Sequence, residues 1–501
     1  MSNLALYLLA TARRISERIA VIAEDHAMTY AELDAATSRL ATFLNREGVG
    51  AGDRVGVMLP NVPAAVIAYY GIWRRGAIAV PINPLMQARE VQFYLSNTSA
   101  KALFGSPEFA AAATAAAQAA GSKLWLVDDA ELARLSDDLP EFGDPVQRAA
   151  DDTAVVLHTS GTTGTPKGAE LTHGGLGSNQ DVIVRRLAKL TDDDVVLACL
   201  PLFHVFGMTC AMNAAIASGA ALSLMARFHP VKAVERIRRD RVTVFEGVPT
   251  MYTALLTVAD QFPPDAIATL RLCVSGGAAL PVAVLNDFEK AFNAVILEGY
   301  GLSETSPAVT FNHPDAERRP GSIGTPIEGV QVRLVDDDGN EVPIGTPGEL
   351  QVKGPNVMKA YWNLPEATAA SIKDGWFSTG DIALVDEDGY YYIVDRKKDL
   401  IIRGGYNVYP REVEEALHEH PAVAQVAVIG IPHDSLGEEI GAAVVLKRGA
   451  SVSPEELRQF VKDRVAAYKY PRRIWFLDSL PMGPTGKLLR REVKPPPLEE
   501  V

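Results

Sequence analysis

The sequence predicts an α/β protein: a large N-terminal domain of helix-covered β-sheets plus a β-barrel-like subdomain, with a small, mobile α+β domain at the C-terminus. Three observations favour this architecture. The chain has 501 residues, which is too many for a single ordinary core. Its first part alternates helical patterns with short apolar runs. The pattern then changes twice, near residue 330 and again near residue 395.

The first part supplies helices and buried strands in alternation. Residues 29–44 carry apolar side chains at helical spacing, with Thr29 as the expected N-cap. The apolar run at residues 54–59 suits a buried strand. The alanine-rich segment from Phe109 predicts a helix that ends at Gly121. Such alternation is typical of sheets that helices cover on both faces.

Antiparallel hairpins are expected from residue 330 onward. The sequence there alternates with period two and is interrupted by Asp-Gly and Gly-Thr-Pro-Gly turns. Asp386, Asp388 and Gly389 would also suit the start of a calcium-binding loop. No acidic residue closes such a loop at the required spacing, so a hairpin turn is the favoured interpretation.

The end of the chain has a complete set of elements of its own. We therefore predict one domain at residues 1–394 and a second, smaller one at residues 395–501. Pro410 is expected to open a helix that runs to about residue 420. The other expected elements are strands at residues 423–431 and 442–446 and a helix at residues 454–468.

Composition argues against several classes of function. The formal net charge of −14, without a basic stripe, gives no attraction to nucleic acid. Cys199, Cys210 and Cys273 lie in apolar contexts, which predicts reduced core thiols and a cytoplasmic location. The first apolar run has seven residues, too few to span a bilayer, and arginines follow it, the wrong order for a signal peptide. We expect at most peripheral membrane contact, and an oligomer is compatible with the sequence.

One stretch, HTSGTTGTPKG at residues 158–168, has the composition of a phosphate-binding loop. Glycines allow close backbone approach, hydroxyls and amides donate to phosphate oxygens, and Lys167 adds a charge. It differs from a Walker loop because its lysine follows a proline and precedes a glycine. A Ser/Thr/Gly-rich surface linker is the alternative interpretation.

Five further stretches follow in order: SGGAAL at 275–280, EGYGLSET at 298–305, FSTGD at 377–381, DRKKDLIIRGGYNVYPREVE at 395–414 and PTGKLLRREV at 484–493. With the loop, their order and spacing resemble the adenylate-forming superfamily, which includes acyl-CoA synthetases, aryl-CoA ligases and the adenylation domains of peptide synthetases. The resemblance covers nearly the whole chain and is to the acyl-CoA synthetase, or fatty-acid–CoA ligase, branch. Each motif alone is weak, and the ordered set is specific.

The resemblance implies how ATP is held. Ser303 would contact the α-phosphate, and Glu304 would hold Mg²⁺ with Thr159, because hard cations prefer oxygen ligands. Asp381 would accept hydrogen bonds from both ribose hydroxyls, and Arg396 would also reach the ribose. Tyr300 would stack on the adenine. The β- and γ-phosphates would be wrapped by Thr159, Ser160, Gly161, Thr162, Thr163, Gly164 and Lys167. The remaining nucleotide-binding residues would be Gly276, Gly277, Ala278, Glu298 and Gly299.

The resemblance also assigns residues in the small domain. Lys487 would bridge the substrate carboxylate and the α-phosphate as a catalytic cation; the alternative is a solvated surface lysine. Lys398 would be the hinge for rotation between the two half-reactions. Gly404 and Gly405 would line the thiol channel, or simply form a turn.

The acid pocket is expected beside residues 200–208. Relatives that activate amino acids place an aspartate there, and this chain has Phe203 and His204, so a buried ammonium would lack a partner. His204 is a gate between pocket and thiol channel under the family interpretation, and a core histidine under the alternative. Gly301 is expected to leave the pocket deep, with Val248 and Met251 as additional apolar wall.

These expectations converge on an ATP-dependent acyl-CoA synthetase of lipid metabolism. An apolar carboxylic acid, medium- or long-chain or bulky and cyclic, would react with ATP to give acyl-AMP and pyrophosphate. Coenzyme A would then take the acyl group. The expected cofactors are ATP, Mg²⁺ and coenzyme A. Two alternatives stay open: an acyl-AMP ligase that loads a carrier protein, and a non-catalytic nucleotide-binding paralogue.

Overall fold

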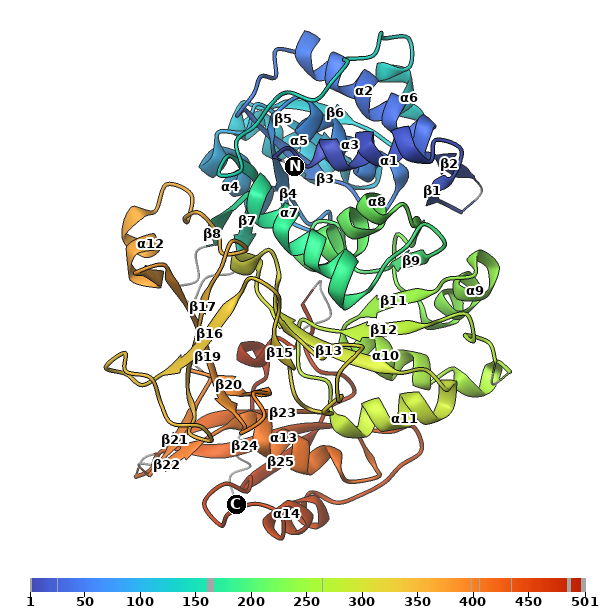
Figure 1. Ribbon diagram of the computed structural model, residues 1–501. Helices are drawn as coiled ribbons and strands as arrows, with labels where there is room; N and C mark the ends of the chain where they lie inside the picture. The colour runs from blue at the N-terminus through green and yellow to red at the C-terminus, as the bar shows by residue number, and fades with distance from the viewer. Residues whose placement is uncertain are drawn as a thin grey trace.

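The computed structural model describes residues 2–24, 26–159, 166–263, 265–397, 399–404, 406–433, 435–483 and 488–496. The chain runs from blue helices and strands at the top of Figure 1, through green and yellow layers, to a red C-terminal layer at the bottom. Four β-sheets organise these layers. The predicted α/β class is therefore confirmed.

The first sheet has six strands in the order β6-β5-β3-β4-β7-β8 and is parallel except for β8. Helices α4 and α5 pack on one face, and α2 and α3 lie in the core of the other. The strands are β3 (Arg54–Met58), β4 (Ile78–Pro81), β5 (Ala102–Gly105), β6 (Lys123–Leu126), β7 (Thr153–Thr159) and β8 (Lys167–Thr172). The helices are α1 (Ala5–Arg14), α2 (Tyr30–Arg46), α3 (Pro63–Arg74), α4 (Ala88–Thr98), α5 (Ala110–Ala120) and α6 (Asp129–Ser136).

The second sheet has nine strands in the order β15-β14-β13-β12-β11-β9-β10-β1-β2. Its six central strands are parallel, so their carboxyl ends meet at one edge. The strands are β1 (Ile19–Ile22), β2 (Ala27–Thr29), β9 (Val195–Ala198), β10 (Ala221–Leu224), β11 (Val244–Gly247), β12 (Leu272–Ser275), β13 (Ile296–Gly301), β14 (Ala308–Phe311) and β15 (Thr325–Pro326). The associated helices are α7 (His173–Val182), α8 (Ala214–Ser218), α9 (Pro230–Asp240), α10 (Pro249–Leu256) and α11 (Val282–Phe292).

The third sheet is antiparallel and has five strands, with the path β16-β17-β19-β18 and β20 paired to β19. It occupies the place of the predicted barrel-like subdomain. Its elements are β16 (Gln331–Val335), β17 (Gly348–Lys353), α12 (Pro365–Ser371), β18 (Ile372–Lys373), β19 (Trp376–Val385) and β20 (Tyr391–Arg396). The hairpin prediction at Asp386 and Asp388 is confirmed, because both carboxylates bind Arg319 at 2.6 Å and the turn joins β19 to β20.

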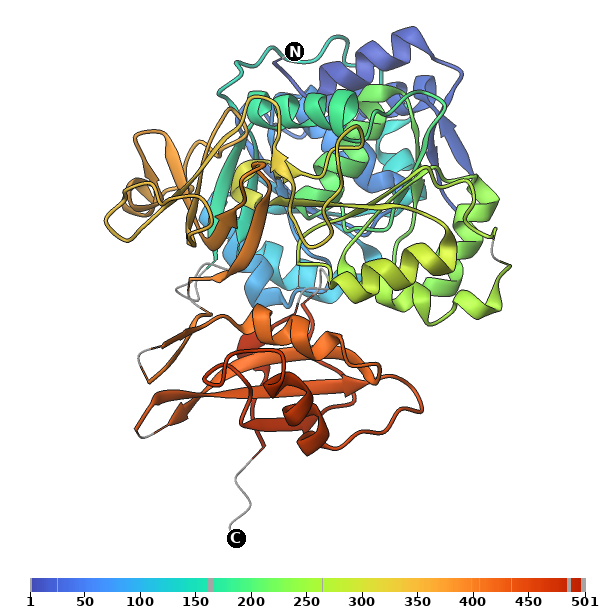
Figure 2. The ribbon, with the colours of Figure 1, turned by 60° about the horizontal axis from the view of Figure 1, so that its bottom comes forward.

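The C-terminal residues form the fourth sheet, with the path β22-β21-β24-β23 and β25 paired to β24. Figure 2 shows this sheet and its helices as a red layer beneath the rest of the chain. The elements are β21 (Ile401–Arg403), β22 (Tyr406–Val408), α13 (Pro410–His418), β23 (Val423–His433), β24 (Gly437–Leu446), α14 (Pro454–Lys462) and β25 (Arg473–Phe476). Separate apolar clusters fill this layer. Strand β20 runs one residue past Asp395, and the division into domains there stays a prediction.

Local sequence signals explain several element ends. Thr29 accepts a hydrogen bond from the backbone of Glu32, whose carboxylate binds Thr29 in return, so a capping box starts α2. Gly121 ends α5 in the left-handed conformation, as expected. Helix α14 ends at Lys462, earlier than predicted. There the Arg464 guanidinium donates to the Phe460 carbonyl at 2.9 Å and so occupies an acceptor that a continuing helix would use.

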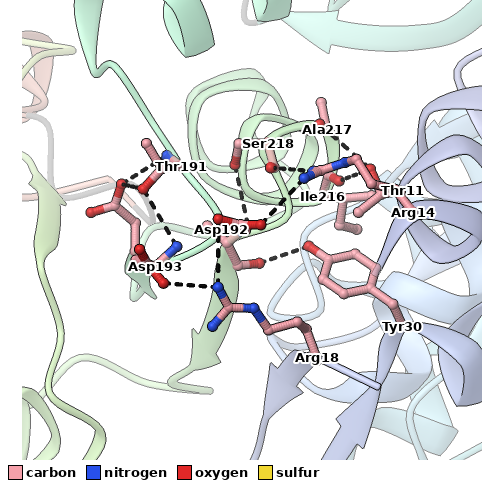
Figure 3. Close-up of polar contacts among 12 residues, drawn as sticks. Thr11, Arg14, Arg18, Tyr30, Thr191, Asp192, Asp193, Ile216, Ala217 and Ser218 are labelled. Carbon is pink, nitrogen blue, oxygen red and sulfur yellow. Dashed lines mark hydrogen bonds and ion pairs between the residues drawn. The ribbon is translucent and has the colours of Figure 1, made fainter. Parts of the chain in front are cut away.

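Polar contacts join the N-terminal helices to the second sheet layer (Figure 3). Thr11 of α1 donates to the carbonyl of Ile216 at 2.9 Å, and the Tyr30 hydroxyl donates to that of Ala220 at 2.7 Å. Arg14 and Arg18 pair with acidic residues of the loop before β9. The ion pairs are exposed and contribute little to stability. The buried hydrogen bonds and the apolar core therefore hold the layers together.

Candidate active site

The predicted magnesium residues come together in space. Glu304, in the turn after β13, accepts hydrogen bonds at 3.1 Å from the hydroxyls of Thr159 and Tyr361 on the same oxygen, Oε1. The backbone of Met358 donates to the carbonyl of Glu304 at 2.7 Å and fixes the turn. Thr159 ends β7 and stands 145 positions from Glu304 in the chain. A carboxylate and a hydroxyl therefore face the point where the phosphate-loop sequence begins.

Lys167 lies on the other side of the same loop. It opens β8 and is the Cα partner of Thr159 in the β7–β8 ladder. Its Nζ lies 5.2 Å from the centre of the Tyr361 ring, at cation–π distance. Tyr361 thus contacts both Glu304 and Lys167, and it was not predicted because it belongs to no motif. Burial, with Glu304 nearby, raises the pKa of its hydroxyl, which stays protonated.

His158, which begins the loop stretch, is held inside the protein. Its ring stacks on Tyr94 with 4.0 Å between centroids, and its Nε2 lies 3.1 Å from the Asn97 side-chain oxygen. Burial lowers the pKa of His158 to about 4, so the ring is neutral at pH 7. His158 therefore anchors the end of β7 and adds no charge for phosphate.

The predicted ribose residues also meet. The Tyr300 hydroxyl donates to Asp381 Oδ2 at 2.6 Å, and Arg396 Nε lies 3.4 Å from Asp381 Oδ1. Asp381 and Arg396 are Cα partners in the β19–β20 ladder, so backbone pairing holds them side by side. Asp381 is buried, which strengthens both interactions.

Glu298, which is predicted to bind the nucleotide, is held by two backbone N–H groups. Its carboxylate accepts hydrogen bonds from the backbone of Leu280 at 3.3 Å and of Gly321 at 3.1 Å. Burial raises its pKa to about 7. Glu298 therefore connects two loops beneath the nucleotide residues. Ala278, in the first of these loops, is exposed.

A pocket opens at the carboxyl edge of the second sheet. Apolar residues and glycines make most of its wall, and none of the lysines and arginines that the structure describes lines it. The predicted residues in its wall are His204, Gly276, Gly277, Gly299, Tyr300, Gly301 and Ser303. Three polar side chains in the wall were not predicted: Glu246 and Thr310, which belong to no motif, and Ser275, which opens the SGGAAL stretch.

Three residues expected to line the acid pocket are absent from its wall. Val248 and Met251 are buried behind it, where Met251 Sδ lies 3.9 Å from Cys199 Sγ. Phe203 is half-buried beside His204 and does not line it. Apolar residues of other segments, among them Ile183 and Phe206, form the wall in their place.

The expectation that Gly301 leaves the pocket deep is not supported by the backbone around it. A Cβ built at this position would lie 1.9 Å from the carbonyl oxygen of Pro307 and 2.6 Å from its carbonyl carbon. The glycine is therefore needed for close approach of two backbone segments. The depth of the pocket cannot be attributed to a missing side chain at residue 301, because a side chain there would meet backbone.

His204 lies in the pocket wall, and its ring is already oriented. Its Nδ1 accepts a hydrogen bond from the backbone of Phe206 at 3.2 Å, and its carbonyl accepts from Met208 at 2.9 Å. With Nδ1 as an acceptor, a neutral ring carries its proton on Nε2. The position suits the predicted gate.

Several predicted residues lie outside the described residues: Ser160, Gly161, Thr162, Thr163, Gly164, Lys398, Gly405 and Lys487. Gly404 is described; it has φ of +57° and donates its N–H to the carbonyl of Leu436 at 2.8 Å. That geometry is a turn, as the alternative interpretation had it, and it leaves the thiol-channel role a prediction.

Comparison with known proteins identifies the family. The model of the AMP-binding enzyme family matches residues 8–362, and that of the AMP-binding enzyme C-terminal domain matches residues 412–487. The chain belongs to the AMP-binding enzyme family. The predicted superfamily and its acyl-CoA synthetase branch are therefore confirmed.

Relatives of this AMP-binding enzyme match over nearly the full chain. A long-chain-fatty-acid–CoA ligase of Bacillus subtilis (strain 168) is 36% identical, over 96% of this chain and 92% of the relative. A feruloyl-CoA synthase of an Amycolatopsis species is 40% identical, over 93% and 94%. The crystal structure of ATP-bound MatB from Rhodopseudomonas palustris is 33% identical, with a TM-score of 0.92 and 98% of both chains covered. The predicted class, an AMP-forming acid–thiol ligase, is confirmed.

The oxygen ligands suit Mg²⁺. Among the described residues, no group of three or more His, Cys, Asp and Glu side chains could hold a metal ion. Mg²⁺ in nucleotide sites is bound by one or two carboxylates together with substrate phosphates, so Glu304 with Thr159 fits that pattern. Within the described part of the chain, no helix is long and apolar enough to span a membrane.

Proposed function

We propose that this enzyme activates an apolar carboxylic acid with ATP and transfers the acyl group to coenzyme A. The observation that carries the proposal is the position of one pocket. Its wall includes Tyr300, which binds Asp381, and Ser303, which precedes Glu304. A ribose site, a phosphate site and an apolar cavity thus share one segment of chain, residues 300–304.

The chemistry divides into two displacements. The acid carboxylate attacks the α-phosphorus of ATP, which forms acyl-AMP and releases pyrophosphate; the coenzyme A thiolate then attacks the acyl carbonyl and releases AMP. Glu304 and Thr159 would hold Mg²⁺, which neutralises phosphate charge. Lys167 would bind the departing pyrophosphate. Lys487 would stabilise charge at the α-phosphorus in the first step.

The relatives support coenzyme A as the acyl acceptor and indicate the range of acids to test. The two sequence relatives described above are a long-chain-fatty-acid–CoA ligase and a feruloyl-CoA synthase, so their acids range from a flexible chain to an aromatic ring. The apolar wall of the pocket accommodates either. Three buried free cysteines support a cytoplasmic location, since reduced thiols persist there.

A panel of carboxylic acids tests the proposal, with pyrophosphate release and thioester formation assayed separately. We expect pyrophosphate release that depends on the acid, followed by stoichiometric coenzyme A thioester. Pyrophosphate release without thioester would favour the carrier-protein alternative. The absence of both products for every acid would favour the non-catalytic paralogue.

A further inference from the structure

One ionisable side chain in the pocket wall has no role in the reaction above. Glu246 lies on β11, is 2% exposed, and lines the pocket. It is the Cα partner of Val274 on β12, which in turn pairs with Leu297 on β13. Glu246 is therefore level with Leu297, several residues before Ser303 in the turn that follows β13. A carboxyl group thus stands in the floor of the pocket, away from the phosphate site.

One oxygen of the Glu246 carboxyl lacks a hydrogen-bond partner among the described residues. This oxygen, Oε2, is buried. The nearby Tyr252 hydroxyl is committed to the carbonyl of Val274 at 2.7 Å. Cys199, also nearby, is directed to the backbone carbonyl of Glu246, 3.6 Å from its Sγ. No lysine or arginine among the described residues lines the pocket, so none of them supplies the carboxyl with a counter-ion there.

Such an arrangement is unfavourable for the protein alone. Burial raises the pKa of Glu246 to about 8, so the carboxyl is mostly neutral at pH 7. Even a neutral carboxyl that buries an oxygen without a partner destabilises the fold, whereas an apolar side chain there would not. A ligand that supplies the missing hydrogen bonds accounts for the placement.

Two hydroxyls in the same wall are also without partners. Ser275 Oγ and Thr310 Oγ1 are buried, line the pocket, and make no hydrogen bond with described residues. Ser275 is the Cα partner of Gly247, the residue after Glu246. Three unpartnered polar groups in an otherwise apolar wall are a pattern that recognises a polar group on an apolar ligand.

We propose that Glu246 selects acids that carry a hydroxyl group at the end remote from the reacting carboxylate. The inference rests on the proposed acid activation and names the substrate class. A hydroxyl matches a neutral carboxyl because each can donate and accept one hydrogen bond. A second carboxylate would find no cation among the described residues of the wall, and an unsubstituted chain would leave the Glu246 carboxyl without a hydrogen bond from the substrate. A substrate ammonium would pair with an ionised Glu246, so two charges would be buried. Apart from that carboxylate, only the hydroxyls of Ser275 and Thr310 would accept its hydrogen bonds.

Matched pairs of acids that differ only in the distal hydroxyl test this inference. The aromatic pair is 3-(4-hydroxyphenyl)propanoate and 3-phenylpropanoate, and the aliphatic pair is 10-hydroxydecanoate and decanoate. The measured quantity is kcat/KM for pyrophosphate release, expressed as the ratio within each pair. We expect the wild type to favour the hydroxylated member of at least one pair about tenfold. The pair that responds identifies whether the hydroxyl is borne by a ring or by a chain.

Variants test whether the preference for hydroxylated acids depends on Glu246. E246L should lose the preference and gain activity on the plain acid, and E246Q, whose amide also forms hydrogen bonds, should keep part of it. Cys273→Ala is the matched control, since Cys273 is buried on β12, next to Val274, and is absent from the pocket wall. Each kcat/KM ratio compares two acids on the same variant, so a loss of folded enzyme lowers both values equally and leaves the ratio unchanged.

Outcomes separate this inference from the proposed function. Turnover of plain acids without any preference for the hydroxylated members would overturn the inference and leave the proposed function standing. An unchanged preference in E246L would also overturn it. If no acid in the panel gives pyrophosphate release, the proposed function fails and the inference fails with it.

Discussion

Thr159 and Glu304 stand 145 positions apart in the chain and meet at 3.1 Å, hydroxyl to carboxylate. The contact joins the end of β7, where the hydroxyl-rich loop begins, to the turn after β13. Tyr361 binds the same oxygen of Glu304 and lies against Lys167. The phosphate end of the site is therefore assembled from both large sheets and held by one carboxylate.

The role of that carboxylate is tested by Glu304→Gln. The amide keeps the shape and removes the negative charge, so Mg²⁺ would lose its protein carboxylate. We expect acid-dependent pyrophosphate release to fall about 100-fold or more, in line with the loss of a preorganised electrostatic group. Tyr361→Phe removes only one hydrogen bond and should lower the rate of pyrophosphate release about tenfold or less. Rates measured across a Mg²⁺ titration would disprove the assignment if Glu304→Gln matched the wild type.

The ribose site gives a second prediction. Asp381 is held by Tyr300 at 2.6 Å and lies beside Arg396 at 3.4 Å. Asp381→Asn should weaken ATP binding by about 2 kcal/mol, the order expected for hydrogen bonds to a buried charged group. Tyr300→Phe should weaken it by about 1 kcal/mol. Calorimetric titration with ATP measures both, and equal affinities for all three proteins would refute the ribose assignment.

Gly301 supplies a prediction about backbone packing. Because a Cβ would approach the Pro307 carbonyl oxygen to 1.9 Å, Gly301→Ala should destabilise the protein by about 3 kcal/mol. It should lower activity on acids of every length without creating a preference for short ones. Thermal unfolding and a chain-length profile check this. A stable variant with a shifted profile would restore the view that residue 301 sets pocket depth.

Glu246 predicts how stability depends on pH. Its pKa is about 8 in the folded protein against a usual value of 4.5, so the folded state binds its proton more tightly than the unfolded state does. Its contribution to the free energy of unfolding is fully present below pH 4.5 and falls through the interval up to pH 8, by up to ~1.4 kcal/mol per unit. Burial also raises the pKa values of Cys199, Cys210 and Tyr252, so these neighbours stay neutral there.

The comparison that isolates this effect is the wild type against E246L. Unfolding midpoints at pH 5, 6, 7 and 8 should show that the wild type loses stability relative to E246L as the pH rises. Parallel profiles for the two proteins would mean that Glu246 does not titrate in this interval.

Much of the fold followed from local sequence signals. Thr29 with Glu32 fixed the start of α2, and Gly121 fixed the end of α5, because capping depends on neighbouring residues alone. The early end of α14 was missed because it depends on where the Arg464 side chain folds back. Thr159, Glu304 and Asp381 were assigned by the family resemblance, which the order and spacing of the motifs carry.

The pocket was harder to predict. Its wall combines single residues from many elements, so Glu246 and Thr310 carry no local signal, while Val248 and Met251 looked suitable and lie behind the wall. Tyr361 was missed for the same reason, since its contacts with Glu304 and Lys167 arise only when distant segments meet. Tertiary arrangement, which spacing does not encode, decides these positions.

In the proposed reaction, a substrate carboxylate attacks the α-phosphorus of ATP. An acid whose carboxylate oxygens are both ¹⁸O, turned over with ATP and coenzyme A, tests this step. The attacking oxygen stays on phosphorus when the thiolate cleaves the acyl–oxygen bond. We therefore predict one ¹⁸O atom in each AMP and none in pyrophosphate, measured by mass spectrometry. Unlabelled AMP, or label in pyrophosphate, would contradict the account.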